Sequence, residues 1–234
     1  MLEDILASGF GELSLSVDAQ ALPRYRLYFD RLAEQNKLMN LTAIDGEEDS
    51  ARLHFLDSAA LLTLADFRGK SVIDVGSGAG FPGLALKVAE PDIRLTLLDS
   101  LEKRVRFLRA LSDELGFDDV VCLHARAEEA PPKLRESFDI ACSRAVARLN
   151  LLCELCLPFV RVGGLFLAMK GPGAEEEARE AKTAIRLLGG ELERIAVYPI
   201  PGTDTRHSAV VIRKVRQTET KYPRRWAQIK KQPL

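Results

Sequence analysis

The chain has 234 residues, and its 33 Lys and Arg against 34 Asp and Glu give a formal net charge of −1. A nearly neutral total argues against a protein that binds nucleic acid through a positive field over most of its surface. The charge is unevenly spread, because residues 213–234 carry a net charge of +7 and the first 212 residues carry −8. With 47% hydrophobic and 29% charged residues, the composition excludes wholesale disorder.

The apolar stretches are too interrupted to cross a bilayer. The most apolar window, residues 149–169, contains Glu154, Pro158 and a Gly-Gly pair. The N-terminal residues lack the basic and apolar regions of a signal peptide, so we expect a cytoplasmic protein with reduced cysteines. Cys153 and Cys156 form a C-x-x-C pair, which is compatible with a redox pair or half of a zinc site. No second pair follows, so we favour two buried helix residues and no metal site.

The first part of the chain has the pattern of helices. Apolar residues from Leu22 to about Met39 recur at helical spacing, and a second helical stretch runs from about Glu47 to Asp66. Residues 40–44 between them have the pattern of a loop. We therefore expect a helical N-terminal extension over residues 1–66.

From residue 71 onward, short apolar strands alternate with helices. The predicted strands are residues 72–75, 94–98, 120–123, 138–142, 163–169, 195–200 and 207–212. This alternation predicts an α/β domain over residues 67–214 with a mostly parallel, seven-stranded, Rossmann-like sheet covered on both faces. The short turn before the last strand makes that strand antiparallel, because parallel neighbours need a long crossover. Residues 215–234 form a basic C-terminal tail.

A glycine-rich turn at residues 76–83 follows the first strand. In an open α/β sheet, ligands bind beyond the carboxyl ends of the strands, so this turn is the main candidate for a ligand site. A dinucleotide cofactor is one alternative. However, the sixth position of G-x-G-x-x-G, counted from Gly76, is Phe81, so the dinucleotide fingerprint fits poorly.

S-adenosylmethionine is the other alternative for this turn. The pattern Asp74-x-Gly76-x-Gly78-x-Gly80 resembles the D/E-x-G-x-G-x-G loop of the class I methyltransferases. Its glycines let the backbone pass close to a ligand. Asp99, at the end of the second strand, suits the two hydroxyls of a ribose, which both cofactors contain. Asp99 alone therefore does not discriminate between them.

Several motifs together resemble the RsmG family, also called glucose-inhibited division protein B. They are Asp74–Gly83, Leu98–Arg104, Ala125–Glu128, Ser143–Ala145 and Met169–Gly171, with Asn40–Ile44 and His54–Ser58 ahead of the domain. The resemblance covers nearly the whole chain. It implies a class I methyltransferase that transfers a methyl group from S-adenosylmethionine to N7 of one guanine in 16S rRNA of the small ribosomal subunit.

The resemblance also implies which residues hold the cofactor. They are Gly76, Gly78 and Phe81 in the first loop, Asp99, Ser100 and Leu101 at the ribose, Ala127 and Glu128 at the adenine, and Arg144 at the methionine end or the reaction centre.

The residues are consistent with methylation at a ring nitrogen. Guanine N7 has an exposed lone pair, so the reaction needs orientation and electrostatics more than a general base. The Asn/Asp-Pro-Pro-aromatic motif of exocyclic-amine methyltransferases is absent after the fourth strand, where Ser143 and Arg144 stand. Cys142 falls at an inner strand position, which does not suit the nucleophile of a pyrimidine C5 methyltransferase. We expect Arg144 to bind the cofactor carboxylate or guanine O6.

The expected partner is 16S rRNA or the small ribosomal subunit. We expect the protein to be a monomer. The candidate RNA contacts are basic residues after the strands and basic or aromatic residues in the tail, namely Arg148, Lys170, Arg206, Lys221, Tyr222, Arg224 and Arg225. A solvated, disordered basic terminus is the alternative for the tail. The tail resembles the family, but Ala227 stands where a glycine is expected. His54 is expected to pack in a helix and not to act in catalysis.

Two rival functions remain open at this point. One is a nicotinamide-dependent oxidoreductase, and the other is a cofactor-binding module that only binds RNA. Calorimetry with S-adenosylmethionine and NAD separates the first rival, and mapping of N7-methylguanine in rRNA separates the second.

Overall fold

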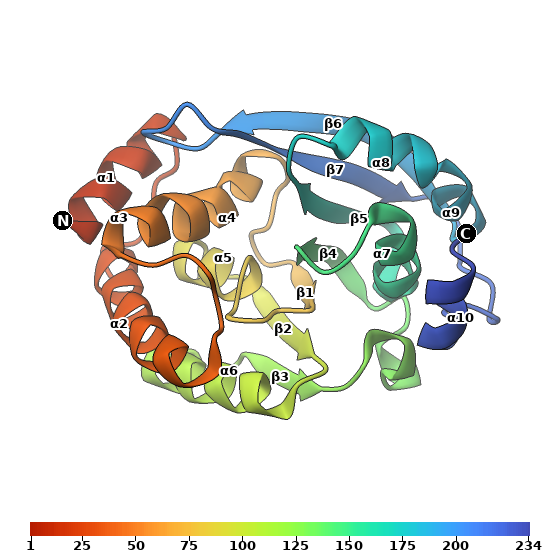
Figure 1. Ribbon diagram of the computed structural model, residues 1–234, viewed down its shortest axis with the longest axis horizontal. Coiled ribbons are helices and arrows are strands. Elements are labelled where there is room, and N and C mark those ends of the chain that lie inside the picture. The colour runs from red at the N-terminus through yellow and green to blue at the C-terminus, as the bar shows by residue number, and fades with distance from the viewer.

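A computed structural model describes residues 1–234 and shows a three-layer α/β arrangement, with helices on both faces of one sheet (Figure 1). The strands are β1 (Ser71–Val75), β2 (Arg94–Asp99), β3 (Val121–His124), β4 (Phe138–Arg144), β5 (Val160–Lys170), β6 (Gly190–Pro199) and β7 (Arg206–Lys214). The helices are α1 (Leu2–Glu12), α2 (Ala21–Met39), α3 (Glu47–Ser50), α4 (Asp57–Ala59), α5 (Gly83–Ala89), α6 (Glu102–Glu114), α7 (Leu149–Cys156), α8 (Ala174–Glu180), α9 (Lys182–Leu187) and α10 (Trp226–Lys231).

The sheet has the strand order β3-β2-β1-β4-β5-β7-β6. β1 pairs in parallel with both β2 and β4, so Val72 lies between Leu95 and Ile140. β7 is antiparallel to both of its neighbours, β5 and β6. The predicted fold is thereby confirmed, including the antiparallel last strand. The strand order reverses between β1 and β4, which is where a ligand cleft is expected in such a sheet.

Alternation along the strands divides the core between the two faces of the sheet. Val72 points into a cluster of 39 buried residues that also takes in α1, α2, α5 and α6. Its neighbour Ile73 points into a second cluster of 25 residues with α7, α8 and α9. Successive side chains of a strand face opposite ways, so a strand buried on both faces is mostly apolar, as β1 is apart from Ser71 and the buried Asp74.

The N-terminal extension packs into the core of the sheet. Tyr25 and Tyr28 of α2 and Phe55 are fully buried in the same cluster as Val72. α2 ends at Met39, where the predicted loop begins, and Asn40 has a left-handed conformation. The predicted helix over residues 47–66 begins at Glu47 but changes its winding, because a π-helical turn over Ala51–Leu56 joins α3 to α4.

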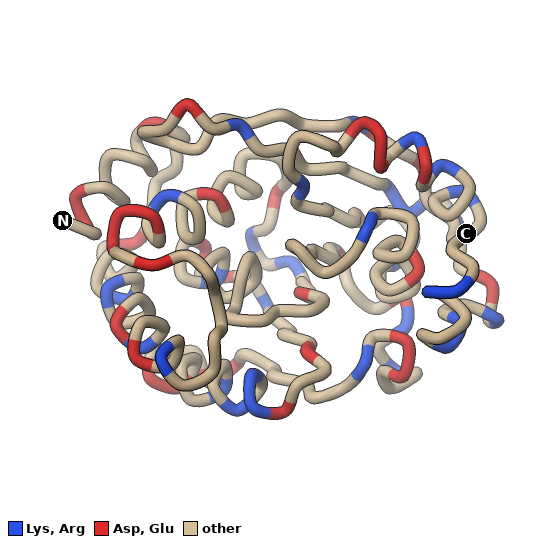
Figure 2. Tube along the Cα trace, viewed as in Figure 1, with Lys and Arg blue, Asp and Glu red and all other residues tan.

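The basic tail docks against the body of the protein. The side chains of Thr218, Tyr222 and Ile229 are buried, and α10 lies beside α7 (Figure 1). The alternative of a solvated, disordered terminus is therefore wrong. Lys and Arg gather on this C-terminal segment, while charges of both signs alternate over the rest of the chain (Figure 2). None of the helices is both long enough and apolar enough to span a bilayer.

Candidate active site

A cleft of about 1160 Å³ opens at the carboxyl ends of β1, β4 and β5, where the strand order reverses. It brings together eight of the residues predicted from the sequence, which are Gly76, Gly78, Phe81, Asp99, Ser100, Arg144, Arg148 and Lys170. Leu101 and Arg206 are not part of its lining, although Thr205 and His207 are. The loop at residues 41–44 and the turns after Leu53 supply the rest of one wall, so the extension takes part in the site.

The glycine turn needs residues without a Cβ for reasons of both conformation and space. Gly76, Gly78 and Gly80 all have positive φ angles, of 77°, 58° and 101°. A Cβ on Gly76 would lie 2.4 Å from a methyl group of Val146, and one on Gly80 would lie 2.2 Å from the hydroxyl oxygen of Tyr28. The turn can therefore come close to β4 and to α2 only because these positions are glycine.

Asp99 organises the turn from the neighbouring strand. Its Oδ2 accepts the backbone N–H of Gly78 at 2.9 Å, and its Oδ1 accepts that of Leu101 at 2.8 Å. The carboxylate is nearly buried at the end of β2 and lines the cleft. Each carboxylate oxygen can accept a second hydrogen bond, so this arrangement still allows contact with a diol.

Arg144 lies across the cleft, held by the N-terminal extension. Its Nη1 donates to the carbonyl of Leu53 at 2.9 Å and lies 3.2 Å from Oδ2 of Asp57. Its Nη2 donates to Nδ1 of His54 at 2.8 Å. Ala145, the next residue, has φ = 57°, a conformation that non-glycine residues rarely adopt and that often marks a functional site.

His54 is held as a neutral imidazole in one tautomer. Burial and the adjacent Arg144 lower the pKa of His54 to about 3. Because a guanidinium can only donate, Nδ1 of His54 is the acceptor and the proton lies on Nε2. Nε2 is 2.8 Å from the hydroxyl of Thr42. The backbone N–H and carbonyl of Thr42 are hydrogen-bonded to the side-chain amide of Asn36, which fixes this residue.

The ring of Phe81 is enclosed in a stack. It lies nearly parallel to the rings of Tyr28, at 5.3 Å, and of His54, at 4.2 Å, and the guanidinium of Arg144 is 4.9 Å from its centroid. Phe81 is only 4% exposed. Any contact that it makes with a cofactor must therefore use its backbone or a ring edge, while the ring itself orders the cleft wall.

Asp57 joins three side chains at the edge of the cleft. Besides Arg144, it accepts the hydroxyl of Tyr198 at 3.0 Å and Nδ1 of His207 at 2.9 Å. Asp57 is 1% exposed, and its hydrogen bond raises the pKa of His207 above the ordinary value. The three partners come from β4, β6 and β7, so this carboxylate ties the extension to the second half of the sheet.

The predicted basic rim is partly neutralised by its own surroundings. Lys170 is 2.8 Å from Glu177 and donates to the carbonyl of Ala147, and Arg148 is 2.5 Å from Glu180. Arg206 is exposed and has no partner within the protein. Of the three residues, Arg206 is the one whose charge is uncompensated.

Ala127 and Glu128 lie in a separate cavity of about 280 Å³ between the loop after β3 and the tail. The Oε1 atom of Glu128 is buried without a hydrogen-bond partner and has only Arg126 at 3.6 Å. A buried acceptor of this kind lacks a donor such as an amino group. The structure thus places the two predicted adenine contacts beside the main cleft and not in its lining.

The expectation that Tyr222 and Arg224 contact RNA needs correction. Tyr222 is 7% exposed, and Arg224 forms a two-pronged ion pair with the buried Glu154, with a shortest distance of 2.6 Å. Both residues dock the tail, so the guanidinium of Arg224 and most of the surface of Tyr222 are used within the protein. Lys221 and Arg225 remain exposed.

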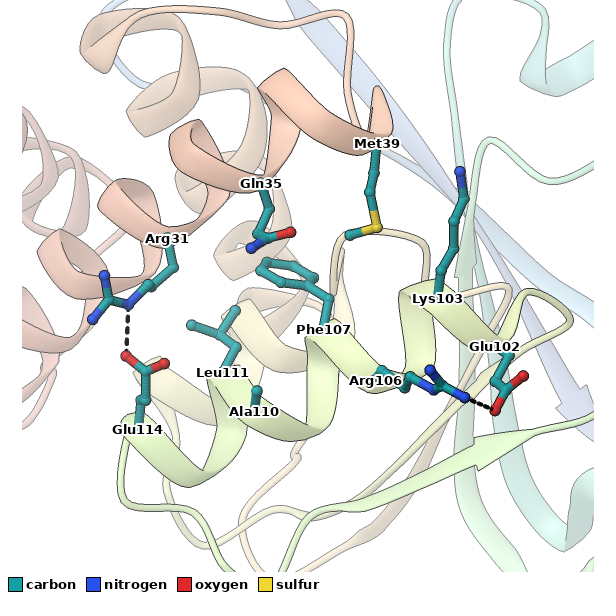
Figure 3. A pocket seen from close by; sticks show the side chains of 10 residues that line it. All are labelled: Arg31, Gln35, Met39, Glu102, Lys103, Arg106, Phe107, Ala110, Leu111 and Glu114. Carbon is teal, nitrogen blue, oxygen red and sulfur yellow. Dashed lines mark hydrogen bonds and ion pairs between the residues drawn. The ribbon is translucent and has the colours of Figure 1, made fainter.

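A third cavity of about 480 Å³ lies between α2 and α6. Its floor contains Phe107 and Leu111, and its rim carries the ion pairs Arg31–Glu114 and Arg106–Glu102 (Figure 3). None of the predicted site residues lies in it.

The four cysteines are buried free thiols, with Cys153 and Cys156 inside α7 as predicted. Burial raises the pKa values of both thiols far above the ordinary range, so neither is a reactive thiolate. No three His, Cys, Asp or Glu side chains come together as a metal site would require.

The sequence did not indicate Asp57, Tyr198 and His207 as a group. Each comes from a different part of the chain, and only the folded sheet brings them together. The one available signal was the motif His54–Ser58, which includes Asp57 but did not indicate what Asp57 does.

Comparisons with known proteins agree with this site. A family model described as GidB, rRNA small subunit methyltransferase G, matches residues 21–207. The ribosomal RNA small subunit methyltransferase G of Acetivibrio thermocellus is 44% identical over 97% of this chain and 93% of the relative. The proteins of the same name from Alkaliphilus metalliredigens and Bacillus cytotoxicus are 46% and 43% identical, over 98% and 97% of this chain and 98% and 96% of the relatives.

Solved structures show the same fold at lower identity. An S-adenosylmethionine-dependent methyltransferase from Aquifex aeolicus has a TM-score of 0.53 and 18% identity, covering 70% of this chain and 92% of that one. A 16S rRNA (adenine(1408)-N(1))-methyltransferase from Catenulisporales acidiphilia has a TM-score of 0.52 and 14% identity, covering 65% and 88%.

Proposed function

Because the chain belongs to the GidB family of rRNA small subunit methyltransferases, we propose that it transfers a methyl group from S-adenosylmethionine to N7 of a guanine in 16S rRNA, releasing S-adenosylhomocysteine. The observation that carries this proposal is the glycine turn at the point where the strand order reverses, with Arg144 held opposite it. A ribosomal substrate implies that the enzyme acts in the cytoplasm.

The cleft and the separate cavity at Glu128 fit this cofactor in two respects. A Cβ on Gly78 would meet no atom nearer than 3.9 Å, so the glycine turn faces open space there and a ligand can approach its backbone closely. The unpartnered Oε1 of Glu128 suits the amino group of adenine, which is a hydrogen-bond donor. We further propose contacts from Ser100, Leu101 and Ala127 next to these groups.

The residues of the cleft perform orientation and not proton transfer. S-adenosylmethionine, when bound, supplies a methyl group on a positively charged sulfur. Asp57 is committed to three partners, and Asp99 holds two backbone N–H groups. Asp74 is fully buried behind the turn. Guanine N7 needs no deprotonation, so a cleft without a free general base is suited to it.

Arg144 is the residue that we assign to the reaction centre. Three of its five N–H groups are bound by Leu53, Asp57 and His54, which leaves Nε and one N–H of Nη2 without a partner in the protein. Nε and Nη2 together form the edge of the guanidinium that can bind a carboxylate or a carbonyl side-on. They are therefore suited to the cofactor carboxylate or to guanine O6.

RNA contacts are proposed for the basic residues that remain exposed. Arg206 stands beside the cleft without an internal partner, and Lys221 and Arg225 are exposed on the docked tail. Arg148 and Lys170 can contribute only if RNA phosphates compete with Glu180 and Glu177. The cleft is thus bordered by a few local positive groups on an acidic body.

Mapping of N7-methylguanine in 16S rRNA after incubation with the protein and S-adenosylmethionine tests this function. Free rRNA and assembled small subunits form two arms of the same experiment. One new N7-methylguanine is expected in at least one arm, and methylation at any other atom or in no RNA contradicts the proposal.

An Arg144→Ala variant tests the assigned residue. We expect methyl transfer to fall by at least about 100-fold, since a group that orients and polarises the reacting atoms is lost. Arg161→Ala is the matched control, because Arg161 is an exposed arginine paired with Asp139 at the opposite ends of the strands. If Arg144→Ala keeps the cofactor affinity and the methylation rate of the parent, the assignment is wrong.

A further inference from the structure

Asp57 is a fully buried carboxylate that meets Arg144 at the cleft wall. Its two oxygens take hydrogen bonds from Arg144, Tyr198 and His207 at 2.9 to 3.2 Å. Asp57 is 1% exposed and Arg144 is 18% exposed, so water screens this ion pair only weakly. The pair therefore determines the net charge on this side of the cleft.

The proposed reaction makes this charge important. The lone pair of guanine N7 forms the new N–C bond while the electrons of the S–C bond stay on sulfur, so the positive charge passes from the cofactor to the guanine ring and no proton moves. A bare guanidinium beside these groups would repel the positive charge throughout. An arginine suits this place only if its charge is offset.

We propose that Asp57 is a positioning residue that offsets the charge of Arg144, so that Arg144 acts in the cleft as a hydrogen-bond donor and not as a free cation. This inference rests on the proposed methyl transfer. The guanidinium is fixed through three contacts on one side, and its Nε and remaining Nη2 hydrogens stay available on the other.

Two of the neighbouring groups, His54 and Lys170, add little charge to this side of the cleft, while His207 shares the Asp57 carboxylate with Arg144 and has a raised pKa. His54 accepts from Arg144 and is neutral, because a donor already faces its Nδ1 atom. Lys170, which also lines the cleft, is compensated by Glu177 at 2.8 Å. Removing the carboxylate of Asp57 would thus leave Arg144 uncompensated.

The affinity ratio of S-adenosylmethionine to S-adenosylhomocysteine reports this charge directly. The two molecules differ by the methyl group and its positive charge, so contacts common to both cancel in the ratio. Calorimetry on the purified full chain gives both affinities without any methyl transfer. In Asp57→Asn the positive charge of Arg144 is no longer offset, so we expect S-adenosylmethionine to lose about tenfold in affinity relative to S-adenosylhomocysteine. A unit charge within roughly 10 Å at an effective dielectric constant near 20 gives an effect of this size.

Two further variants separate charge from structure. Arg144→Gln leaves His207 as the one possible charge partner of Asp57, so the affinities are measured at a pH above the raised pKa of His207, where His207 is neutral. There Arg144→Gln is expected to move the ratio in the opposite direction, in favour of S-adenosylmethionine. The double variant, Asp57→Asn with Arg144→Gln, is expected to return the ratio to within about twofold of the parent, because both charges are gone. A purely structural role for Asp57 would not produce this reversal.

Glu154→Gln provides the matched control. Glu154 is also 1% exposed and pairs with an arginine that is 14% exposed, but the pair lies under the tail. The Glu154→Gln variant is expected to lower thermal stability without changing the affinity ratio. If Asp57→Asn does not fold, the direction in which Arg144→Gln shifts the affinity ratio still tests the inference.

An unchanged ratio in the single variants, or a shift in Asp57→Asn that the double variant retains, overturns the inference. These outcomes differ from a failure of the proposed function. In that case the parent protein would bind neither molecule, or would leave guanine N7 unmethylated.

Discussion

Asp74 is a carboxyl group in an apolar setting behind the glycine turn. It is fully buried, its Oδ2 accepts the N–H of Gly83 at 2.8 Å, and its Oδ1 has no partner. Burial is the main cause that raises the pKa of Asp74 from 3.8 to about 7. The folded protein therefore holds a proton on this group in a pH range where the unfolded chain has lost it.

This proton makes the stability depend on pH in a specific direction. The contribution of protonated Asp74 is fully present below pH 3.8 and is lost as the pH rises to about 7. In Asp74→Asn this dependence disappears. We expect the free energy of unfolding of the parent, relative to the variant, to fall by up to about 1.4 kcal/mol per pH unit in that range.

Urea denaturation at a series of pH values measures this difference. Asp66→Asn, at a carboxylate that is 74% exposed, serves as the control and should run parallel to the parent. A constant difference between the parent and Asp74→Asn from pH 4 to 7 would contradict the assignment of a proton to Asp74.

Gly80 shows how a single missing atom permits the fold of the cleft. Its φ of 101° disfavours any side chain, and a Cβ would meet the hydroxyl of Tyr28, which is itself fixed by a hydrogen bond to the carbonyl of Ala79. We expect Gly80→Ala to lose about 3 kcal/mol or more of stability, because strain and overpacking add. Gly171→Ala, where a Cβ meets open space, is expected to stay within about 0.5 kcal/mol of the parent in the same thermal unfolding series.

At the scale of elements, the tail separates docking residues from charged residues. Arg224, Tyr222 and Ile229 face the body of the protein, while Arg225, Lys230 and Lys231 are exposed. A folded basic segment presents its charges in fixed positions, which a disordered tail does not. RNA binding through this segment can therefore be removed without unfolding it.

Replacing Arg225, Lys230 and Lys231 together by Gln should weaken RNA binding and flatten its dependence on salt. Each phosphate contact contributes roughly 0.7 to 0.9 to the logarithmic salt slope, so the loss is expected to lie between about 1 and 3 units. Filter binding to 16S rRNA at several salt concentrations measures the slope. The same change at Arg68, Lys70 and Arg94, beside the amino ends of the strands, is the control and should leave the slope nearly unaltered. Equal effects of the two triple variants would exclude a specific role for the tail.

The elements were largely predictable, because hydrophobic periodicity is a local property of the sequence. Six of the seven strands have both ends within three residues of the prediction, whereas β6 begins at Gly190, five residues before its predicted start. The glycine turn was placed correctly after β1. The stack of Tyr28, Phe81 and His54 was not predictable, because it joins three segments distant in the chain. The docking of Arg224 was missed for the same reason, since its partner Glu154 lies 70 residues away and looks like an interruption of an apolar helix.

At the scale of the whole molecule, the extension and the tail cover opposite faces of one sheet. Residues of α1 and α2 belong to the first core cluster, and Tyr222 and Ile229 belong to the second. Both clusters include residues of the same strands, so loss of either one exposes the sheet. We infer that the chain unfolds as one cooperative unit.

Trp226, the one tryptophan of the chain, allows this to be tested because it lies in α10. We expect tryptophan fluorescence and far-ultraviolet circular dichroism to give the same midpoint of urea unfolding. Ile229→Ala, which removes a fully buried side chain from α10, should cost about 2 to 5 kcal/mol and shift both midpoints together. A shift confined to the fluorescence signal would show that the tail detaches on its own.

Arg135 binds the backbone of the tail. Its guanidinium donates to the carbonyl oxygens of Thr218, Glu219 and Tyr222. Every residue has a backbone carbonyl oxygen, so these hydrogen bonds do not depend on which side chains stand at positions 219–221. The tail can accept substitutions there while its path stays constant. Natural or engineered variation at these positions could thus retune what the surface recognises without disturbing how the segment is held.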